Sequence, residues 1–87
     1  MKWQIDYSKS AKNFMDEQHL GDKVRELLKN LVLKTCGETI NIDLKKLKGE
    51  WEGSLRIRKG KIRVIVKMDK EKKNIFVQRI DFRGNVY

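Results

Sequence analysis

The chain has 87 residues, of which 21 are Lys or Arg and 12 are Asp or Glu, giving a formal net charge of +9. This length accommodates one hydrophobic core, so we expect residues 1–87 to form a single domain. Hydrophobic residues make up 39% of the chain, which excludes a disordered tail. No stretch approaches the roughly 18 uninterrupted apolar residues of a membrane-spanning helix, and the lone Cys36 cannot form an internal disulfide. We therefore expect a cytoplasmic protein with no membrane partner.

The first elements in the chain are predicted to be a short strand and a short helix. Trp3, Ile5 and Tyr7 alternate with polar residues, which is the period of a half-buried strand. Ser8 is a typical N-cap residue, and the positions that follow it carry an apolar stripe at helical spacing. This stripe consists of Ala11, Phe14 and Met15.

A longer helix is predicted to follow a break at His19–Gly21. Asp22 is its expected N-cap, and Gly37 is its expected end. Aliphatic side chains recur on one of its faces, at Val24, Leu27, Leu28, Leu31 and Val32. Because each helix has one apolar face, we expect the two to pack as a hairpin on a sheet.

The second half of the chain is predicted to contain strands. Residues 38–53 show no regular period, whereas apolar and polar residues alternate from Ser54 onward, with turn signals at Lys59–Lys61 and Asp69–Lys73. In the last strand, alternation places Phe76, Ile80 and Phe82 on one face and Val77, Arg79 and Asp81 on the other. The order β-α-α-β-β-β predicts an α+β fold with a helical hairpin on one face of a mainly antiparallel sheet.

The positive charge is confined to this second half. Residues 1–43 contain seven basic and seven acidic side chains, whereas residues 44–87 contain fourteen basic and five acidic ones. Five of the six arginines also lie there, and the arginine side chain offers a planar fork of donors that suits phosphate. This distribution indicates a polyanionic partner, and the alternative is a solvated surface that only keeps the protein soluble.

Strand alternation gathers these cations on one face of the sheet. Arg56, Arg58, Arg63 and Lys67 alternate with aliphatic residues that the helices must cover, so the cations line the opposite face. We expect Arg79 to join them and Arg83 to lie just past the end of the last strand. Asp81 is the one acidic residue evident among them, and neighbouring like charges are destabilising unless acids separate them. The alternation therefore favours an anion-binding surface.

The residue inventory limits the chemistry that such a surface supports. The single His and Cys lie far apart, which leaves no zinc cluster and no Cys/His pair, and no glycine-rich phosphate loop is present. RNA cleavage needs neither a metal nor a cofactor, because the 2′-hydroxyl of the substrate can attack its own phosphate while arginines stabilise the transition state. Tyr87 is the candidate base, since nearby arginines favour its phenolate although an ordinary tyrosine has a pKa of about 10. The alternative is a terminal side chain that only packs or frays.

Three motifs follow one another along this half of the chain. Leu47–Gly49 reads L-K-G, Gly53–Ile65 reads G-S-L-R-I-R-K-G-K-I-R-V-I, and Arg79–Tyr87 reads R-I-D-F-R-G-N-V-Y. They resemble the L-K-G, G-x-x-R-x-R-x-G-x-Y-R-V-I and R-I-x-H-R-x-x-V-Y signatures of the RelE/ParE superfamily of toxins from type II toxin–antitoxin systems, and of its RelE branch in particular. The resemblance extends over nearly the whole chain.

The resemblance implies a ribosome-dependent mRNA endoribonuclease that acts in the ribosomal A site and is held inactive by a cognate antitoxin. It implies that Arg63 and Arg83 stabilise the scissile phosphate, and that Tyr87 matches the tyrosine that serves as base or stacks on the mRNA. It also implies that Arg56 and Arg58 bind the RNA backbone. We expect Lys61, Lys67 and Arg79 to extend this RNA-binding surface. No metal or other cofactor is implied.

Two positions depart from the family pattern. Phe82 stands where the family frequently has a histidine, so an Arg or Lys would have to protonate the leaving oxygen. Ile62 replaces the usual aromatic residue before Arg63. Two alternative functions stay open: a ParE-like, non-enzymatic inhibitor of DNA gyrase, and an RNA-binding module without catalysis.

Overall fold

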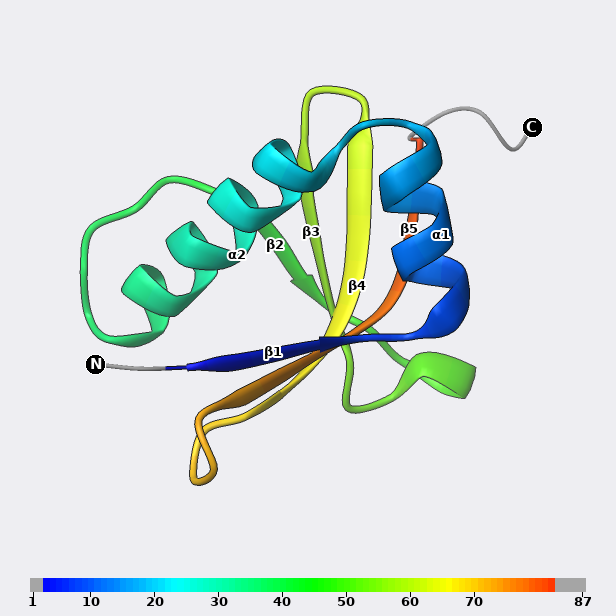
Figure 1. Ribbon diagram of the computed structural model, residues 1–87. Coiled ribbons are helices and arrows are strands. Elements are labelled where there is room, and N and C mark those ends of the chain that lie inside the picture. Colours follow the sequence, from blue (N-terminus) through cyan, green and yellow to red (C-terminus); the bar gives the residue numbers. More distant parts are fainter. Residues whose placement is uncertain (1–2, 83–87) are drawn as a thin grey trace.

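The computed structural model describes residues 3–82, which form a mixed sheet of five strands with two α helices on one of its faces (Figure 1). The elements in chain order are β1 (Gln4–Tyr7), α1 (Lys9–Glu17), α2 (Gly21–Thr35), β2 (Asp43–Lys46), a 3₁₀ helix (Gly49–Trp51), β3 (Leu55–Lys59), β4 (Ile62–Asp69) and β5 (Asn74–Phe82). The strand order is β1-β5-β4-β3-β2, in which β1 runs parallel to β5 and the other pairs are antiparallel. The predicted α+β fold is confirmed, with one strand more than predicted.

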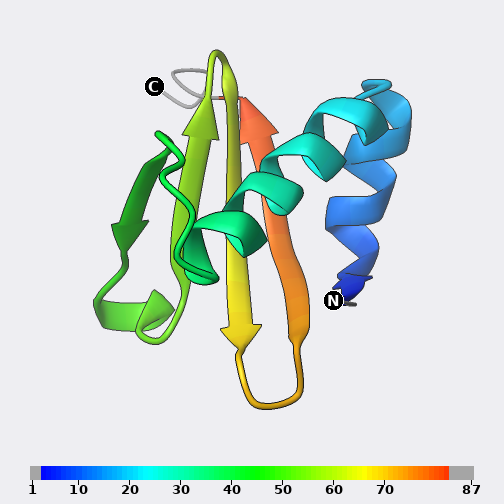
Figure 2. The same cartoon turned by 90° about the vertical axis from the view of Figure 1, so that its left-hand side faces the viewer.

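The additional strand is β2, which lies in the segment predicted to be irregular. It pairs with β3 at the edge of the sheet, where Asp43 lies opposite Arg58 and Lys45 lies opposite Arg56 (Figure 2). Its four residues bury no side chain fully, so it lacks the apolar alternation by which a strand is recognised in a sequence. The strand forms because β3 offers it an edge for backbone hydrogen bonds.

The helices begin and end at specific sequence signals. The hydroxyl of Ser8 accepts a hydrogen bond from the backbone N–H of Ala11 at 3.1 Å, which confirms the predicted N-cap of α1. Helix α2 begins at Gly21, one residue before the expected N-cap, and Asp22 lies in its first turn. Gly37 follows α2 in the left-handed conformation (φ +100°) that favours glycine after a helix.

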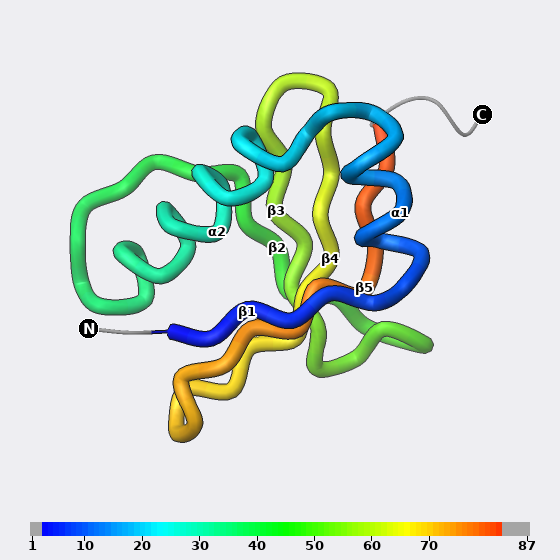
Figure 3. The backbone as a smooth tube through the Cα atoms, viewed as in Figure 1, coloured from blue at the N-terminus to red at the C-terminus, as the bar shows by residue number. Residues whose placement is uncertain are grey.

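The hydrophobic core lies between the helices and the sheet. It joins the predicted apolar stripes of both helices to the inward side chains of β3, β4 and β5. Its members are Ala11, Met15, Leu20, Val24, Leu27, Leu28, Leu31, Ile57, Ile62, Val64, Val66, Ile75, Val77 and Ile80. The N-terminal strand closes this arrangement by lying alongside the last strand, as the backbone trace shows (Figure 3). The opposite face of the sheet is covered by neither α1 nor α2 (Figure 1).

A β-bulge interrupts the pairing of β4 with β5. Ile65 lies opposite Arg79 and Val66 lies opposite Val77, so Gln78 is an extra residue on β5. The backbone carbonyl of Gln78 accepts a hydrogen bond from Ser8 Oγ at 2.8 Å. The bulge is therefore tied to the start of α1.

The bulge reverses the predicted orientation of the first half of β5. Ile75 and Val77 are fully buried, whereas Phe76 is 37% exposed on the opposite face. The prediction that placed Phe76 with Ile80 and Val77 with Arg79 is therefore wrong. An extra residue shifts side-chain alternation by one position, and a prediction that assumes strict alternation along the strand misses that shift.

Candidate nucleic-acid interface

The face of the sheet opposite the helices carries the predicted cations. Strand register places Arg56 and Arg58 on β3, Arg63 and Lys67 on β4, and Arg79 on β5, all on this face. We call these five residues the cationic face. Arg58 and Arg63 are direct cross-strand partners, a like-charge juxtaposition that destabilises a sheet unless neighbouring groups compensate it.

Asp43, at the start of β2, provides part of that compensation. Its Oδ2 lies 2.8 Å from Arg58 Nη2 and also accepts a hydrogen bond from Arg58 Nε at 2.9 Å. Its Oδ1 lies 3.4 Å from Arg56 Nη2. The hydrogen bond from Arg58 is the largest cause of a lowered pKa of the Asp43 carboxyl, so this group stays ionised to lower pH than usual.

Asp81, near the end of β5, has the same role for the other pair of arginines. Its two oxygens accept hydrogen bonds from Arg63 Nε at 2.9 Å and from Arg63 Nη2 at 3.1 Å, which is bidentate geometry. Arg79 Nε donates to the same carboxylate at 3.2 Å. The Asp81 side chain is only 16% exposed, so water competes weakly for these contacts.

These contacts correct the expectation that Asp81 is the one acid among the cations. The unpredicted strand β2 brings Asp43 onto the same face, so four arginines share two aspartates. Arg58 and Arg63 each turn toward a different aspartate, which relieves their mutual repulsion. The face keeps a surplus of positive charge, and its guanidinium groups have fixed positions.

Arg56 is the most enclosed of these arginines, with a side chain that is 17% exposed. Its Nε is buried and lacks a hydrogen-bond partner, the one such side-chain nitrogen or oxygen found in the described residues. A buried donor without a partner is costly, and an acceptor that reached this nitrogen would remove that cost. Phosphate oxygens are acceptors of this kind.

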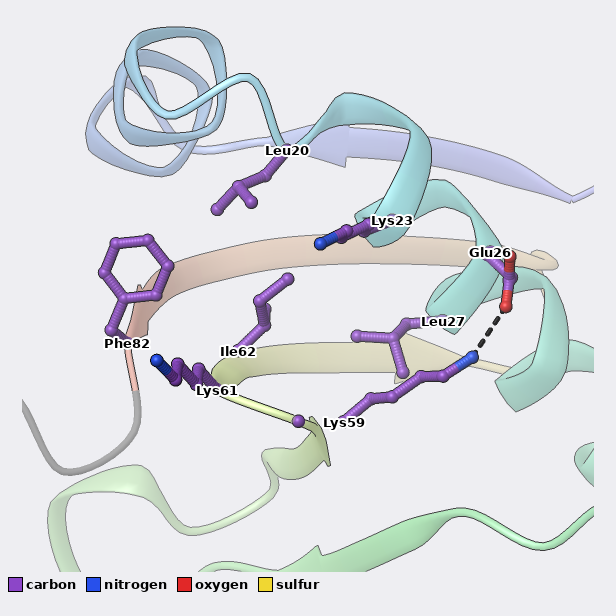
Figure 4. Close-up of a pocket in the computed structure, with 9 residues that line it drawn as sticks. Leu20, Lys23, Glu26, Leu27, Lys59, Lys61, Ile62 and Phe82 are labelled. Carbon is purple, nitrogen blue, oxygen red and sulfur yellow. Dashed lines mark hydrogen bonds and ion pairs between the residues drawn. The ribbon is translucent and has the colours of Figure 1, made fainter.

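Lys61 lies apart from the cationic face. It occupies the two-residue turn between β3 and β4 and lines a pocket of about 470 Å³ against α2 (Figure 4). Lys23 and Phe82 line the same pocket. Across it, Lys59 Nζ lies 2.7 Å from Glu26 Oε1, and this hydrogen bond is the main cause of a lowered pKa of the Glu26 carboxyl. The structure therefore separates Lys61 from the other predicted RNA-binding residues.

Two predicted catalytic residues, Arg83 and Tyr87, lie outside the described residues. Within residues 3–82, no group of three or more His, Cys, Asp or Glu side chains is placed to hold a metal ion. None of the helices in that range is long and apolar enough to cross a membrane.

The architecture of the chain, in which a helical pair covers one face of a five-stranded mixed sheet, is the RelE/ParE-like fold. No protein-family model matches the chain, and no curated protein sequence matches it. The assignment of the fold therefore rests on similarity to solved structures.

Three examples illustrate how completely these structures span the chain. A chain of the archaeal RelE–RelB complex from Pyrococcus horikoshii OT3 has a TM-score of 0.71 at 21% identity, with 99% of this chain and 100% of that chain covered. The RelBE2 toxin–antitoxin complex from Mycobacterium tuberculosis gives 0.69 at 18% identity, covering 95% and 100%. YafQ from E. coli gives 0.69 at 16% identity, covering 99% of both chains.

Proposed function

We propose that this protein is the toxin of a type II toxin–antitoxin pair and that it cleaves mRNA in the ribosomal A site. The observation that carries the proposal is the cationic face, where Asp43 and Asp81 hold four arginines in fixed positions on the side of the sheet without helices. Fixed guanidinium groups bind a phosphodiester with little reorganisation, because folding has already oriented them. Structural similarity to RelE and YafQ chains supports the same class of protein.

The proposed reaction uses a nucleophile that belongs to the substrate. The 2′-oxygen forms a bond to the adjacent phosphorus, the bond from phosphorus to the 5′-oxygen breaks, and the products carry a 2′,3′-cyclic phosphate and a 5′-hydroxyl. The Tyr87 phenolate accepts the proton of the 2′-hydroxyl, and an Arg or Lys supplies a proton to the 5′-oxygen. Arg63 and Arg83 stabilise the charge that develops on the phosphorane. Arg56, Arg58, Lys67 and Arg79 bind the flanking backbone.

We further propose a cytoplasmic location and a cognate antitoxin as partner. Several similar structures are toxin–antitoxin complexes, among them DinJ–YafQ from E. coli. An antitoxin with an acidic segment would complement the cationic face and compete with RNA for it.

A cell-free translation experiment tests the proposal. The protein is added to translating ribosomes, and the ends of the mRNA are mapped. We expect cleavage within the translated region, slowed at least about tenfold by Arg63→Ala and by Tyr87→Phe, because each removes a group that acts on the transition state. Intact mRNA in the presence of folded protein would refute the proposed nuclease activity.

Two variants with the same net charge test whether cleavage depends on the cationic face or only on the net charge of the protein. The double variant Arg56→Gln/Arg58→Gln and the control Lys9→Gln/Lys29→Gln each remove two positive charges, and the control positions are exposed on the helices. We expect cleavage to fall in the first and to persist in the second. Equal losses would mean that only net charge matters, whereas inhibited DNA supercoiling with intact mRNA would establish the ParE-like alternative.

A further inference from the structure

Phe76 is the one large hydrophobic side chain that is exposed in residues 3–82. Its outward position depends on the bulge at Gln78, since the two neighbours of Phe76 on β5 are buried. Full burial of such a side chain contributes about 1.5–3 kcal/mol, and the fold forgoes only the part of it that belongs to the exposed area of Phe76. The ring lies on the same face of the sheet as the arginines.

The surroundings of Phe76 combine an aromatic surface with polar groups. Strand register places it between Lys67 on β4 and Asp6 on β1. A hollow of about 540 Å³ opens beside it, and Asn74 and Met68 contribute to its wall. The other lining residues are Gly53, Lys67, Asp69, Lys70 and Glu71.

The charges of this hollow identify the kind of ligand group that fits it. Two lysines and two acidic residues line it, so its electrostatic attraction for a phosphate is weak. Of the lining carboxylates, Asp69 already accepts a hydrogen bond from the backbone N–H of Lys72 at 3.1 Å, and the lining residue Asn74 donates to Asp6 Oδ2 at 2.9 Å. Within residues 3–82, Phe76 is the one aromatic residue among the exposed side chains that line the hollow, and a flat aromatic ring beside a polar wall suits a stacked, unpaired nucleobase.

The position of Phe76 relative to the arginines agrees with this ligand. Lys67, its cross-strand partner, follows Arg63 by four residues on the same strand and the same face, a separation of about 13 Å along a strand. A single RNA strand bound at Arg63 can therefore extend along β4 and β5 to the ring. We propose that Phe76 is a stacking platform for an unpaired nucleobase of the RNA next to the cleavage site. This inference rests on the proposed function and adds a subsite to it.

Binding of a short unstructured RNA tests the platform. A fluorescent oligoribonucleotide with 2′-O-methyl groups is used, because it lacks the nucleophile and stays intact during titration. We expect Phe76→Leu, which keeps an apolar side chain without a ring, to weaken binding between about fivefold and about 150-fold. Phe76→Trp should retain the affinity, and its added indole fluorescence should change on RNA binding relative to the wild type.

Salt dependence separates stacking from phosphate binding. Phe76→Leu should leave the slope of log K against log salt unchanged, whereas Arg63→Gln should reduce that slope by about 0.7 for each phosphate that the variant no longer binds. Thermal unfolding of both variants, with midpoints near that of the wild type, verifies that the fold is intact.

The outcomes distinguish the platform from the proposed function. The platform alone is refuted if the wild-type protein cleaves mRNA and the Phe76→Leu variant binds the RNA as tightly as the wild type does. Wild-type protein that neither binds the RNA nor cleaves mRNA refutes both. Unchanged RNA binding by Phe76→Leu, combined with failure of this variant to copurify with the antitoxin, would assign the ring to a protein interface and overturn the inference.

Discussion

At the scale of single residues, two aspartates determine how the cationic face is organised. Asp81 forms a bidentate pair with Arg63 and also accepts a hydrogen bond from Arg79. Asp43 forms ion pairs with Arg56 and Arg58. An aspartate in this position has two opposing effects on the proposed binding of RNA. It orients the arginine side chains, and it cancels part of their charge.

Asp81→Asn separates these two effects. We expect the variant to bind single-stranded RNA severalfold more tightly at low salt, because one negative charge leaves the cationic face. We expect its mRNA cleavage to fall at least about tenfold, because a neutral amide no longer holds Arg63 in a bidentate pair. Titration of a non-cleavable RNA and a single-turnover cleavage assay measure the two quantities.

Asp22→Asn is a matched control, because Asp22 pairs with Arg25 on the exposed surface of α2. It should change neither binding nor cleavage. Parallel changes of binding and cleavage in Asp81→Asn would mean that Asp81 affects charge alone.

The residue types on the cationic face were predictable, whereas the partners of its arginines were not. Alternation from Ser54 to Lys67 correctly placed Arg56, Arg58 and Arg63 opposite the core. The pairing with Asp43 depends on contact between segments that are 13 and 15 residues apart. Periodicity within one strand contains no information on such contacts, which arise from sheet register.

At the scale of elements, the bulge in β5 connects three parts of the fold. Ser8, the N-cap of α1, and Ser54, just before β3, both donate to Gln78, through its backbone carbonyl and its side-chain oxygen respectively. Local patterns predicted β1, α1, α2, β3, β4 and β5 because each has an apolar face of its own. They did not predict β2, which has none, or the bulge, which is stabilised by residues distant in sequence.

Ser54→Ala tests the stabilising role of the bulge contacts. Ser54 is 2% exposed, and its hydroxyl lies 2.6 Å from Gln78 Oε1. Removal of the hydroxyl leaves a partly buried acceptor without its donor, so we expect the free energy of unfolding to fall by about 1–3 kcal/mol in denaturant titration. Thr39→Val, which removes a hydroxyl at an exposed position after α2, is the control and should cause a much smaller change. An unchanged midpoint for Ser54→Ala would show that water replaces this hydrogen bond at no cost.

At the scale of the whole molecule, charge pairs join elements that lie far apart in the sequence. Glu26 on α2 pairs with Lys59 at the end of β3, and Asp43 on β2 pairs with Arg58. Hydrogen bonds from these cations lower the pKa of both carboxyl groups in the folded protein. The unfolded chain binds these protons at higher pH, so the stabilisation is fully present above the ordinary carboxyl pKa and is lost as pH falls through the folded pKa.

Glu26→Gln makes this dependence measurable. We expect a small decrease in Tm relative to wild type near pH 6, because the ion pair is exposed and screened by solvent. That difference should shrink toward zero as pH falls below the ordinary carboxyl value of 4.5, since the wild-type carboxylate becomes protonated. A difference that stays constant down to about pH 2 would assign the effect to packing and not to charge.

The parallel pairing of β1 with β5 has a consequence for the synthesis of the protein. Gln4 lies opposite Asn74, and Ser8 donates to Gln78, so the first strand has no partner until the last strand has been made. Asp81 and Arg79 also belong to that last strand. A nascent chain on the ribosome therefore lacks both a closed sheet and half of the carboxylate–arginine contacts, and the cationic face assembles only after β5 has been made.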